Sequence, residues 1–123
     1  LNSKKDYLRY NADRQRDIIL SGEQGVDKVL EEYELDALLF IGSRGSRFLA
    51  KAGYPSVIVP FGFVDNISGN LNNYPSNFNR KPSPIGITFS GTECSEPSLI
   101  SIAYAFEKAS MKRVPPILES YER

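Results

Sequence analysis

The chain has 123 residues and a mass of 13.8 kDa, which allows one folded domain over residues 1–123 with a modest core. Fifteen lysine and arginine residues balance fifteen aspartate and glutamate residues, so the formal net charge is zero. Because binding to phosphates needs clustered positive charge, we expect neither a nucleic acid nor an anionic membrane as a partner. A hydrophobic share of 41% and a charged share of 24% are typical of a soluble globular protein.

The residue types exclude several kinds of chemistry. The chain has no histidine and one cysteine, Cys94, so it cannot hold a Ser-His-Asp triad, a Cys-His pair, a histidine metal ligand or an internal disulfide. We therefore expect no metal site, and the single cysteine favours a reducing, cytoplasmic location. The longest apolar stretch, residues 37–41, is far too short to span a bilayer.

The first third of the chain predicts two helices. Residues 4–20 are mostly polar with scattered apolar positions, which indicates a surface helix that ends at Ser21 and Gly22. A second helix is predicted over residues 24–34, where four apolar side chains share one helical face: Val26, Val29, Leu30 and Tyr33.

Two strands with a short helix between them are predicted next. The apolar run 37–41 is typical of a strand buried in the middle of a sheet. A turn over residues 42–46 leads to a helix over residues 47–52, which Gly53 is suited to end in a left-handed conformation. The β-branched residues 56–59 predict a second buried strand, ended by Pro60.

The last part of the chain predicts a long loop, a strand and a helix. Residues 65–84 are rich in Asn, Ser, Pro and Gly, the composition of a long exposed loop. Residues 85–89 predict a third strand, and Ser95 can cap a final helix. The apolar residues on one face of that helix are Leu99, Ile102, Ala103, Phe106 and Ala109.

The alternation of apolar strands with helices predicts the α/β class, with a small mixed sheet of about three strands covered by helices. So small a sheet would leave apolar edges exposed, so we expect either self-association into a homo-oligomer or a missing remainder of the chain. The first residue, Leu1, is not an initiator methionine, and no leader sequence follows it. We therefore expect this chain to be a piece of a longer protein.

The turn at residues 42–46 is one candidate site. It follows a strand and precedes a helix, where backbone N–H groups can hold an anion, and Arg44 and Arg47 would add positive charge. It lacks the Lys-Ser/Thr ending of a phosphate-binding loop, so an ordinary connection with solvated arginines is the simpler interpretation. A stand-alone small-anion binding module, or a structural or interaction module without catalysis, is the alternative function.

The start of the last helix offers little catalytic chemistry. Glu93 and Glu96 can be paired carboxylates for acid/base work, but the helix dipole explains them more simply. Cys94 lacks a neighbouring base, and we expect it to be a small, partly buried residue. We assign no catalytic residue to this chain.

Three segments, taken together, resemble the C-terminal portion of amidase signature family enzymes. They are residues 35–39 (LDALL), residues 52–62 (AGYPSVIVPFG), and residues 84–109, which contain PIGITF, Gly91, Glu96-Pro97, Leu99 and YAFEKA, and are followed by RVPP at residues 113–116. The resemblance extends over about residues 25–116. The loop at 65–83 departs from it, since it looks about ten residues longer than the usual connection.

The resemblance implies a hydrolase of amide bonds, and sometimes of esters, that forms an acyl-enzyme with a Ser–cis-Ser–Lys triad. In family members the lysine and the two serines precede this portion, so no residue here inherits a catalytic role and we expect the isolated chain not to hydrolyse amides. The portion would complete the α/β sheet and help to shape the substrate pocket. Its partners would be a small-molecule amide substrate and the rest of the amidase chain. The candidate substrate contacts are Ser43, Arg44, Ser46 and Arg47.

Overall fold

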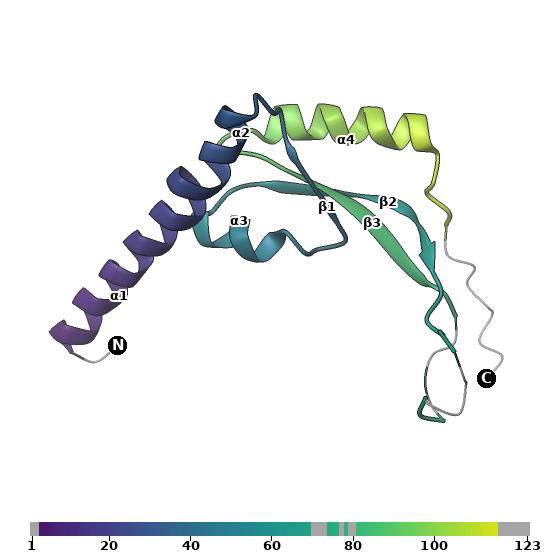
Figure 1. The fold of residues 1–123 in the computed structure, drawn as a ribbon, viewed down its shortest axis with the longest axis horizontal. Helices are drawn as coiled ribbons and strands as arrows, with labels where there is room; N and C mark the ends of the chain where they lie inside the picture. Colours follow the sequence, from purple (N-terminus) through teal and green to yellow (C-terminus); the bar gives the residue numbers. More distant parts are fainter. Residues whose placement is uncertain (1–2, 70–73, 77, 79–80, 116–123) are drawn as a thin grey trace.

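The computed structural model describes residues 3–69, 74–76, 78 and 81–115. Figure 1 shows a three-stranded sheet with helices around it. The elements in chain order are α1 (Lys4–Ile18), the π-helix η1 (Ile19–Asp27), α2 (Lys28–Glu32), β1 (Leu38–Ile41), α3 (Ser46–Ala52), β2 (Ser56–Val64), β3 (Ser83–Ser90) and α4 (Glu96–Ser110). The predicted α/β class, with three strands and helices around them, is confirmed.

The strand order is β1-β3-β2, and β3 runs antiparallel to both neighbours, so the sheet is antiparallel rather than mixed. Residues 87–90 of β3 are all buried, as its central position requires. The prediction that residues 37–41 form the middle strand is wrong, because β1 lies at an edge and exposes Leu39 (56%) and Ile41 (54%). Only Leu38 and Phe40 of β1 pack against a helical layer. An apolar run therefore indicated burial on both faces where only one face is covered.

Strand β2 is longer than predicted, because it continues through Pro60 to Val64. Gly86 accepts a hydrogen bond from Gly42, so the polar groups of Gly86 point toward β1. Pro60 is paired with Gly86 and its ring nitrogen therefore faces the free edge of the sheet, where a missing N–H costs nothing. A bulge between Pro60 and Gly62 shifts the register, and pairing then continues to Val64 opposite Ser83. Strand β3 accordingly begins inside the predicted 65–84 loop.

The predicted helix break at Ser21 and Gly22 is wrong, because the chain stays helical from Lys4 to Glu32. Gly22 is buried, and a Cβ atom there would lie 2.8 Å from the Tyr54 hydroxyl. A Cβ atom at Gly25 would lie 2.8 Å from the Leu20 carbonyl oxygen in the widened π-helical turn. These glycines allow close packing and do not end the helix.

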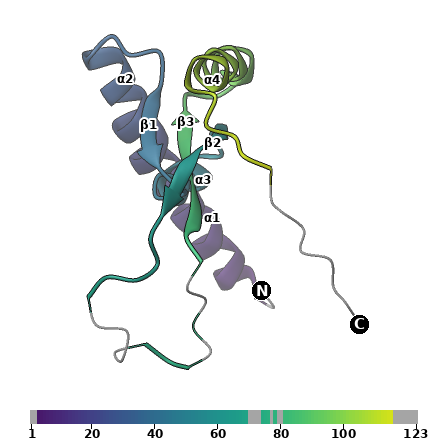
Figure 2. The ribbon, with the colours of Figure 1, turned by 90° about the vertical axis from the view of Figure 1, so that its right-hand side faces the viewer.

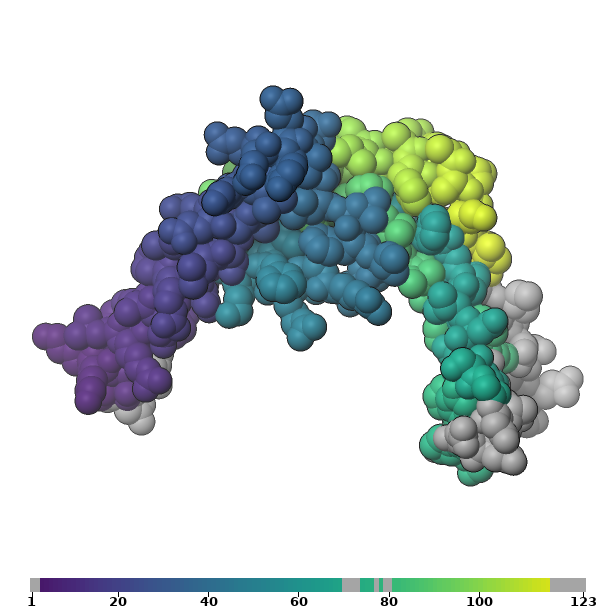
Figure 3. Space-filling model, in the orientation of Figure 1, coloured from purple at the N-terminus to yellow at the C-terminus, as the bar shows by residue number. Residues whose placement is uncertain are grey.

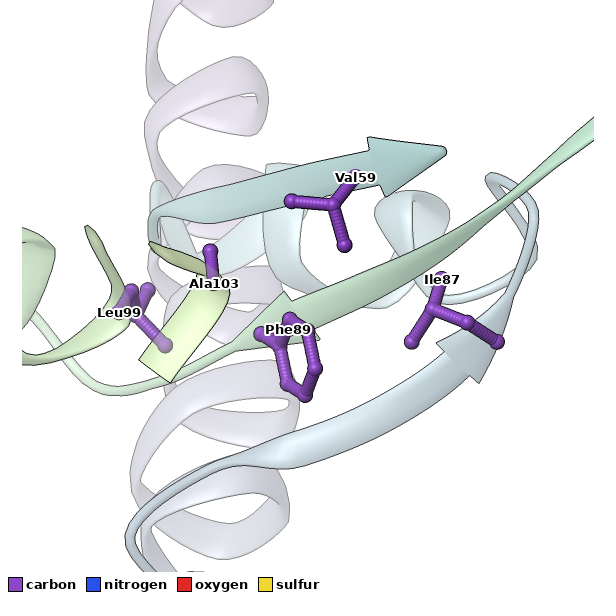
Figure 4. Packing of buried hydrophobic residues seen from close by; sticks show 5 residues of the cluster. All are labelled: Val59, Ile87, Phe89, Leu99 and Ala103. Atoms are coloured by element: carbon purple, nitrogen blue, oxygen red, sulfur yellow. The ribbon is translucent and has the colours of Figure 1, made fainter. Parts of the chain in front are cut away.

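The core consists of two clusters on opposite faces of the sheet. Figure 4 shows the larger one, where Leu99 and Ala103 of α4 lie against three strand residues, Val59, Ile87 and Phe89. On the other face, a smaller cluster joins η1, α2 and α3 through Val26, Leu30 and Leu49, with Leu38 and Phe40 of β1 packed against it. Figure 1 shows α4 above the strands and α3 below them, and Figure 2 shows α4 end-on above the strands. Two thin layers therefore cover this sheet.

The end of α3 and the exposure of α1 are two further features of the helices. Helix α3 ends at Gly53 with φ 84°, the left-handed ending predicted from the sequence. Helix α1 has no buried residue, and Figure 3 shows it reaching away from the body of the molecule. None of the helices that the structure describes combines the length and apolar character needed to cross a bilayer.

The start of α4 differs from prediction in two details. The Ser95 hydroxyl does not bond a helix N–H group but donates to the Thr92 carbonyl oxygen at 2.8 Å. Cys94 is exposed rather than partly buried, and its φ of 62° places it in the left-handed region. The turn before the helix therefore carries the thiol outward.

Candidate functional site

The turn at residues 42–46 leaves the end of β1 and leads into α3. Gly42 has φ 62°, which only glycine adopts freely, and its N–H donates to the Gly86 carbonyl oxygen at 2.7 Å. Gly45 is buried against Phe40, and a Cβ atom at position 45 would lie 2.3 Å from that ring. The sheet and the Phe40 ring therefore fix the turn at both ends.

The four predicted contact residues lie in the turn and at the start of α3, and each of them is exposed: Ser43, Arg44, Ser46 and Arg47. The Ser46 hydroxyl donates to the Ser43 carbonyl oxygen at 2.6 Å, so this hydroxyl is already used within the turn. Among the residues described, neither Arg44 nor Arg47 makes an ion pair, and both guanidinium groups face solvent. Contact with a substrate or an anion at this turn stays a prediction.

Beside the turn lies an apolar pocket of about 210 Å³, formed by η1, α2, β1 and α3. Phe40, which supports Gly45, and Phe48, which follows the turn, both contribute to it. Its wall consists of Leu20, Ser21, Gly25, Val26, Val29, Leu38, Phe40, Phe48 and Leu49. The arrangement has two guanidinium groups at the turn and an apolar hollow next to it, which suits a ligand with one polar and one apolar part. Sequence patterns missed the pocket because its wall comes from three separate segments.

One hydrogen-bonded pair went unpredicted. The Tyr54 hydroxyl donates to Asp27 Oδ2 at 2.5 Å, which joins the end of η1 to the second residue after α3. This hydrogen bond, together with burial and the nearby charges of Asp27, Glu93 and Glu23, raises the pKa of Tyr54 to about 12. The phenol therefore stays protonated at neutral pH and serves as a donor. Asp27 Oδ1 is buried and has no hydrogen-bond partner in the part of the chain that the structure describes.

The remaining candidates add no reactive group. Glu93 and Glu96 are both exposed, and Glu96 stands in the first turn of α4, where a carboxylate complements the helix dipole. Within the described ranges, no three His, Cys, Asp or Glu side chains gather in a way that could hold a metal ion.

Comparisons with known proteins agree in sequence and in structure. No family model matches the chain. The "probable amidase" of Arabidopsis thaliana is 42% identical over 92 residues, which are 75% of this chain and 15% of that protein. The native peptide amidase of Stenotrophomonas maltophilia superimposes with a TM-score of 0.73 and 31% identity, over 90% of this chain and 22% of that one. The chain is similar to the C-terminal part of amidases.

The likeness extends to an amidase with a bound inhibitor. The structure of the peptide amidase PAM with the competitive inhibitor chymostatin superimposes with a TM-score of 0.70 and 31% identity, over 87% of this chain and 22% of that one. The predicted resemblance to the C-terminal portion of an amidase is thus confirmed. The chain spans about 15% of the length of the Arabidopsis amidase and about 22% of these solved amidases.

Proposed function

We propose that this chain is the C-terminal part of an amide hydrolase of the amidase signature family. It completes the sheet of that enzyme and helps to shape its substrate pocket. The acyl-enzyme chemistry of the Ser–cis-Ser–Lys triad belongs to the part of the enzyme outside this chain. The observation that carries the proposal is the TM-score of 0.73 with 31% identity over 90% of the chain against a peptide amidase.

We assign the contribution to substrate binding to the turn at residues 42–46. Arg44 and Arg47 are exposed and unpaired among described residues, so they can approach a polar or anionic end of a substrate. The adjoining apolar pocket of about 210 Å³ has room for one apolar side chain. A small peptide amide has both features, and the names of the solved relatives, a peptide amidase and its chymostatin complex, support this substrate class.

The isolated chain should lack hydrolytic activity. Its tyrosine with a raised pKa is a poor base at neutral pH, and the Ser46 hydroxyl in the turn donates to the Ser43 carbonyl oxygen. Neither group is activated as an acyl-transfer nucleophile needs to be. We further propose that the whole enzyme is cytoplasmic and uses no metal and no organic cofactor.

A segment exchange tests the proposal. The matching 22% of the Stenotrophomonas peptide amidase is replaced by this chain, and hydrolysis of a peptide amide is measured. We expect the chimera to fold and to hydrolyse the amide, and the 123-residue chain alone to show no hydrolysis that survives repurification. A folded chimera without activity, or lasting activity in the isolated chain, would contradict the proposal.

Variants of the chimera test the turn. Arg44→Ala and Arg47→Ala together should raise KM at least several-fold and leave the melting temperature unchanged. Arg14→Ala in exposed α1 is the control, because it removes a surface guanidinium outside the turn. Equal KM values in all chimeras would make residues 42–46 an ordinary surface turn.

A further inference from the structure

The central strand β3 carries two buried hydroxyl groups on one of its faces. Thr88 is 4% exposed and Ser90 is fully buried. They alternate with Ile87 and Phe89, which pack against α4 on the other face. Thr88 pairs with Phe40 of β1, and paired residues direct their side chains to the same face, so Thr88 lies on the side of η1 and α3. A buried hydroxyl costs free energy unless it forms a hydrogen bond, so both groups need partners.

The two hydroxyl groups have different partners. The Ser90 and Ser56 hydroxyl groups share a hydrogen bond of 2.9 Å, which joins β3 to β2. Thr88 Oγ1 instead donates to the Gly42 carbonyl oxygen at 2.6 Å, from a position 46 residues away in the sequence. Gly42 is the first residue after β1 and begins the turn at residues 42–46. The Thr88 hydroxyl therefore connects the middle of the sheet to the candidate site.

Gly42 is held by β3 through both of its backbone polar groups. Its N–H donates to the Gly86 carbonyl oxygen at 2.7 Å, which extends the ladder by one residue beyond β1. Its φ of 62° then turns the chain out of the ladder, and its carbonyl oxygen accepts the hydrogen bond from Thr88. The direction in which the turn leaves the sheet thus depends on the Thr88 hydroxyl as well as on the ladder.

The rest of the turn has little freedom once Gly42 is held. Gly45 is buried against β1, three residues after Gly42. The Ser46 hydroxyl closes the turn by donating to the Ser43 carbonyl oxygen at 2.6 Å. Arg44 therefore stands between two residues whose places the interior determines, Gly42 and Gly45. A shift at Gly42 would move the backbone that carries Arg44.

We propose that Thr88 is a positioning residue for substrate binding, which orients the turn at residues 42–46 from inside the sheet. Because Thr88 is buried, it acts through the Gly42 carbonyl group on the exposed Arg44 and Arg47. Valine has nearly the same shape and suits a strand equally well, but it would leave the Gly42 carbonyl oxygen without this donor. The site thus requires the hydroxyl and not only the volume of the side chain. The inference rests on the proposed contribution of this turn to substrate binding.

Amide hydrolysis by the chimera with the Stenotrophomonas peptide amidase tests the positioning role. Thr88→Val should raise KM at least threefold and leave kcat within twofold, because the turn binds substrate without entering the chemical step. Thr88→Ser keeps the hydroxyl and should bring KM to within twofold of the unsubstituted chimera. Ser90→Ala is the matched control, since it removes the other buried hydroxyl of the same face, and it should leave KM unchanged. An unchanged KM in Thr88→Val, or an equal rise in Thr88→Ser or Ser90→Ala, would overturn the proposal.

Hydrogen exchange in the same chimeras separates this inference from the proposed function, because it requires no activity. Thr88→Val should speed exchange at the Gly42 and Ser46 amides at least fivefold, and Ser90→Ala should not. Unchanged exchange in Thr88→Val would refute the anchoring of the turn. If KM rises in the double variant Arg44→Ala and Arg47→Ala but not in Thr88→Val, the positioning role is wrong and the proposed function stands. If neither raises KM, the turn does not bind substrate, and both are wrong.

Discussion

The hydrogen bond between Tyr54 and Asp27 makes a specific prediction about stability and pH. Tyr54→Phe removes the hydroxyl and retains the ring that packs against η1 and α3. The Asp27 carboxylate then loses its partner at Oδ2, while Oδ1 is buried and already lacks a partner among the described residues. The substitution should therefore destabilise the fold through an unsatisfied carboxylate and not through a cavity.

The size of the effect follows from the pKa. The pKa of Tyr54 rises from 10.0 to about 12, and one pKa unit corresponds to about 1.4 kcal/mol. Taken in full, the shift would give roughly 2.7 kcal/mol, but the side chain is partly exposed and solvent screens the interaction. We expect Tyr54→Phe to cost about 1 kcal/mol at pH 7, the usual size for one hydrogen bond.

The pH dependence has a definite sign. The pKa is higher in the folded state than in the unfolded state, so the unfolded chain loses the phenol proton first as pH rises. The stabilisation is fully present below pH 10 and is lost as pH rises toward 12. The difference in free energy of unfolding between the native chain and Tyr54→Phe should thus be constant up to about pH 9.5 and shrink above it.

Urea unfolding at a series of pH values measures this difference. Tyr104→Phe is the control, because Tyr104 is 61% exposed and the Lys108 ammonium, 5.5 Å from its ring centre, can rest on phenylalanine as well. It should be neutral at every pH. If Tyr54→Phe is also neutral at pH 7, or if its cost grows between pH 10 and 12, the assigned hydrogen bond does not stabilise the fold.

Three further substitutions probe the core and the turns. Leu99→Ala should cost about 3 kcal/mol in urea unfolding, because Leu99 is fully buried against the sheet, whereas Ile100→Ala, at 59% exposure, should cost well under 1 kcal/mol. Gly45→Ala should cost about 1–3 kcal/mol, since the new methyl group would collide with Phe40, and a wild-type melting temperature would contradict the packing of the turn. Cys94→Gly should raise stability by about 1 kcal/mol because it relieves a left-handed residue, and a lowered melting temperature would refute that account.

The sequence predicted the elements well where local chemistry determines them. The periodicity of residues 99–109 predicted α4, and Gly53 predicted the end of α3 with its positive φ. The predictions failed where packing between distant segments determines the structure. Gly22 resembles a helix stop until Tyr54 packs against it, and Pro60 resembles a strand end until β2 proves to be an edge. Neither feature can be recognised from the neighbouring residues in the sequence.

The candidate site was likewise predictable only in part. A turn between a strand and a helix, with Arg44 and Arg47, was predictable from residues 42–47 alone. The apolar pocket beside it was not, since Leu20, Phe40 and Phe48 come from η1, β1 and α3. The link to amidases came from a long ordered resemblance, and sequence and structure comparisons support it to the level of the C-terminal part.

The distribution of apolar side chains explains why β1 matters to this fold. Strand β3 is buried because β1 and β2 flank it and helices cover both of its faces. Strand β1 has a helical layer on one face only, so Leu39 and Ile41 lose about half of the stabilisation that burial would provide. A strand added at this edge would bury these side chains and pair with the backbone groups of β1 that β3 leaves open.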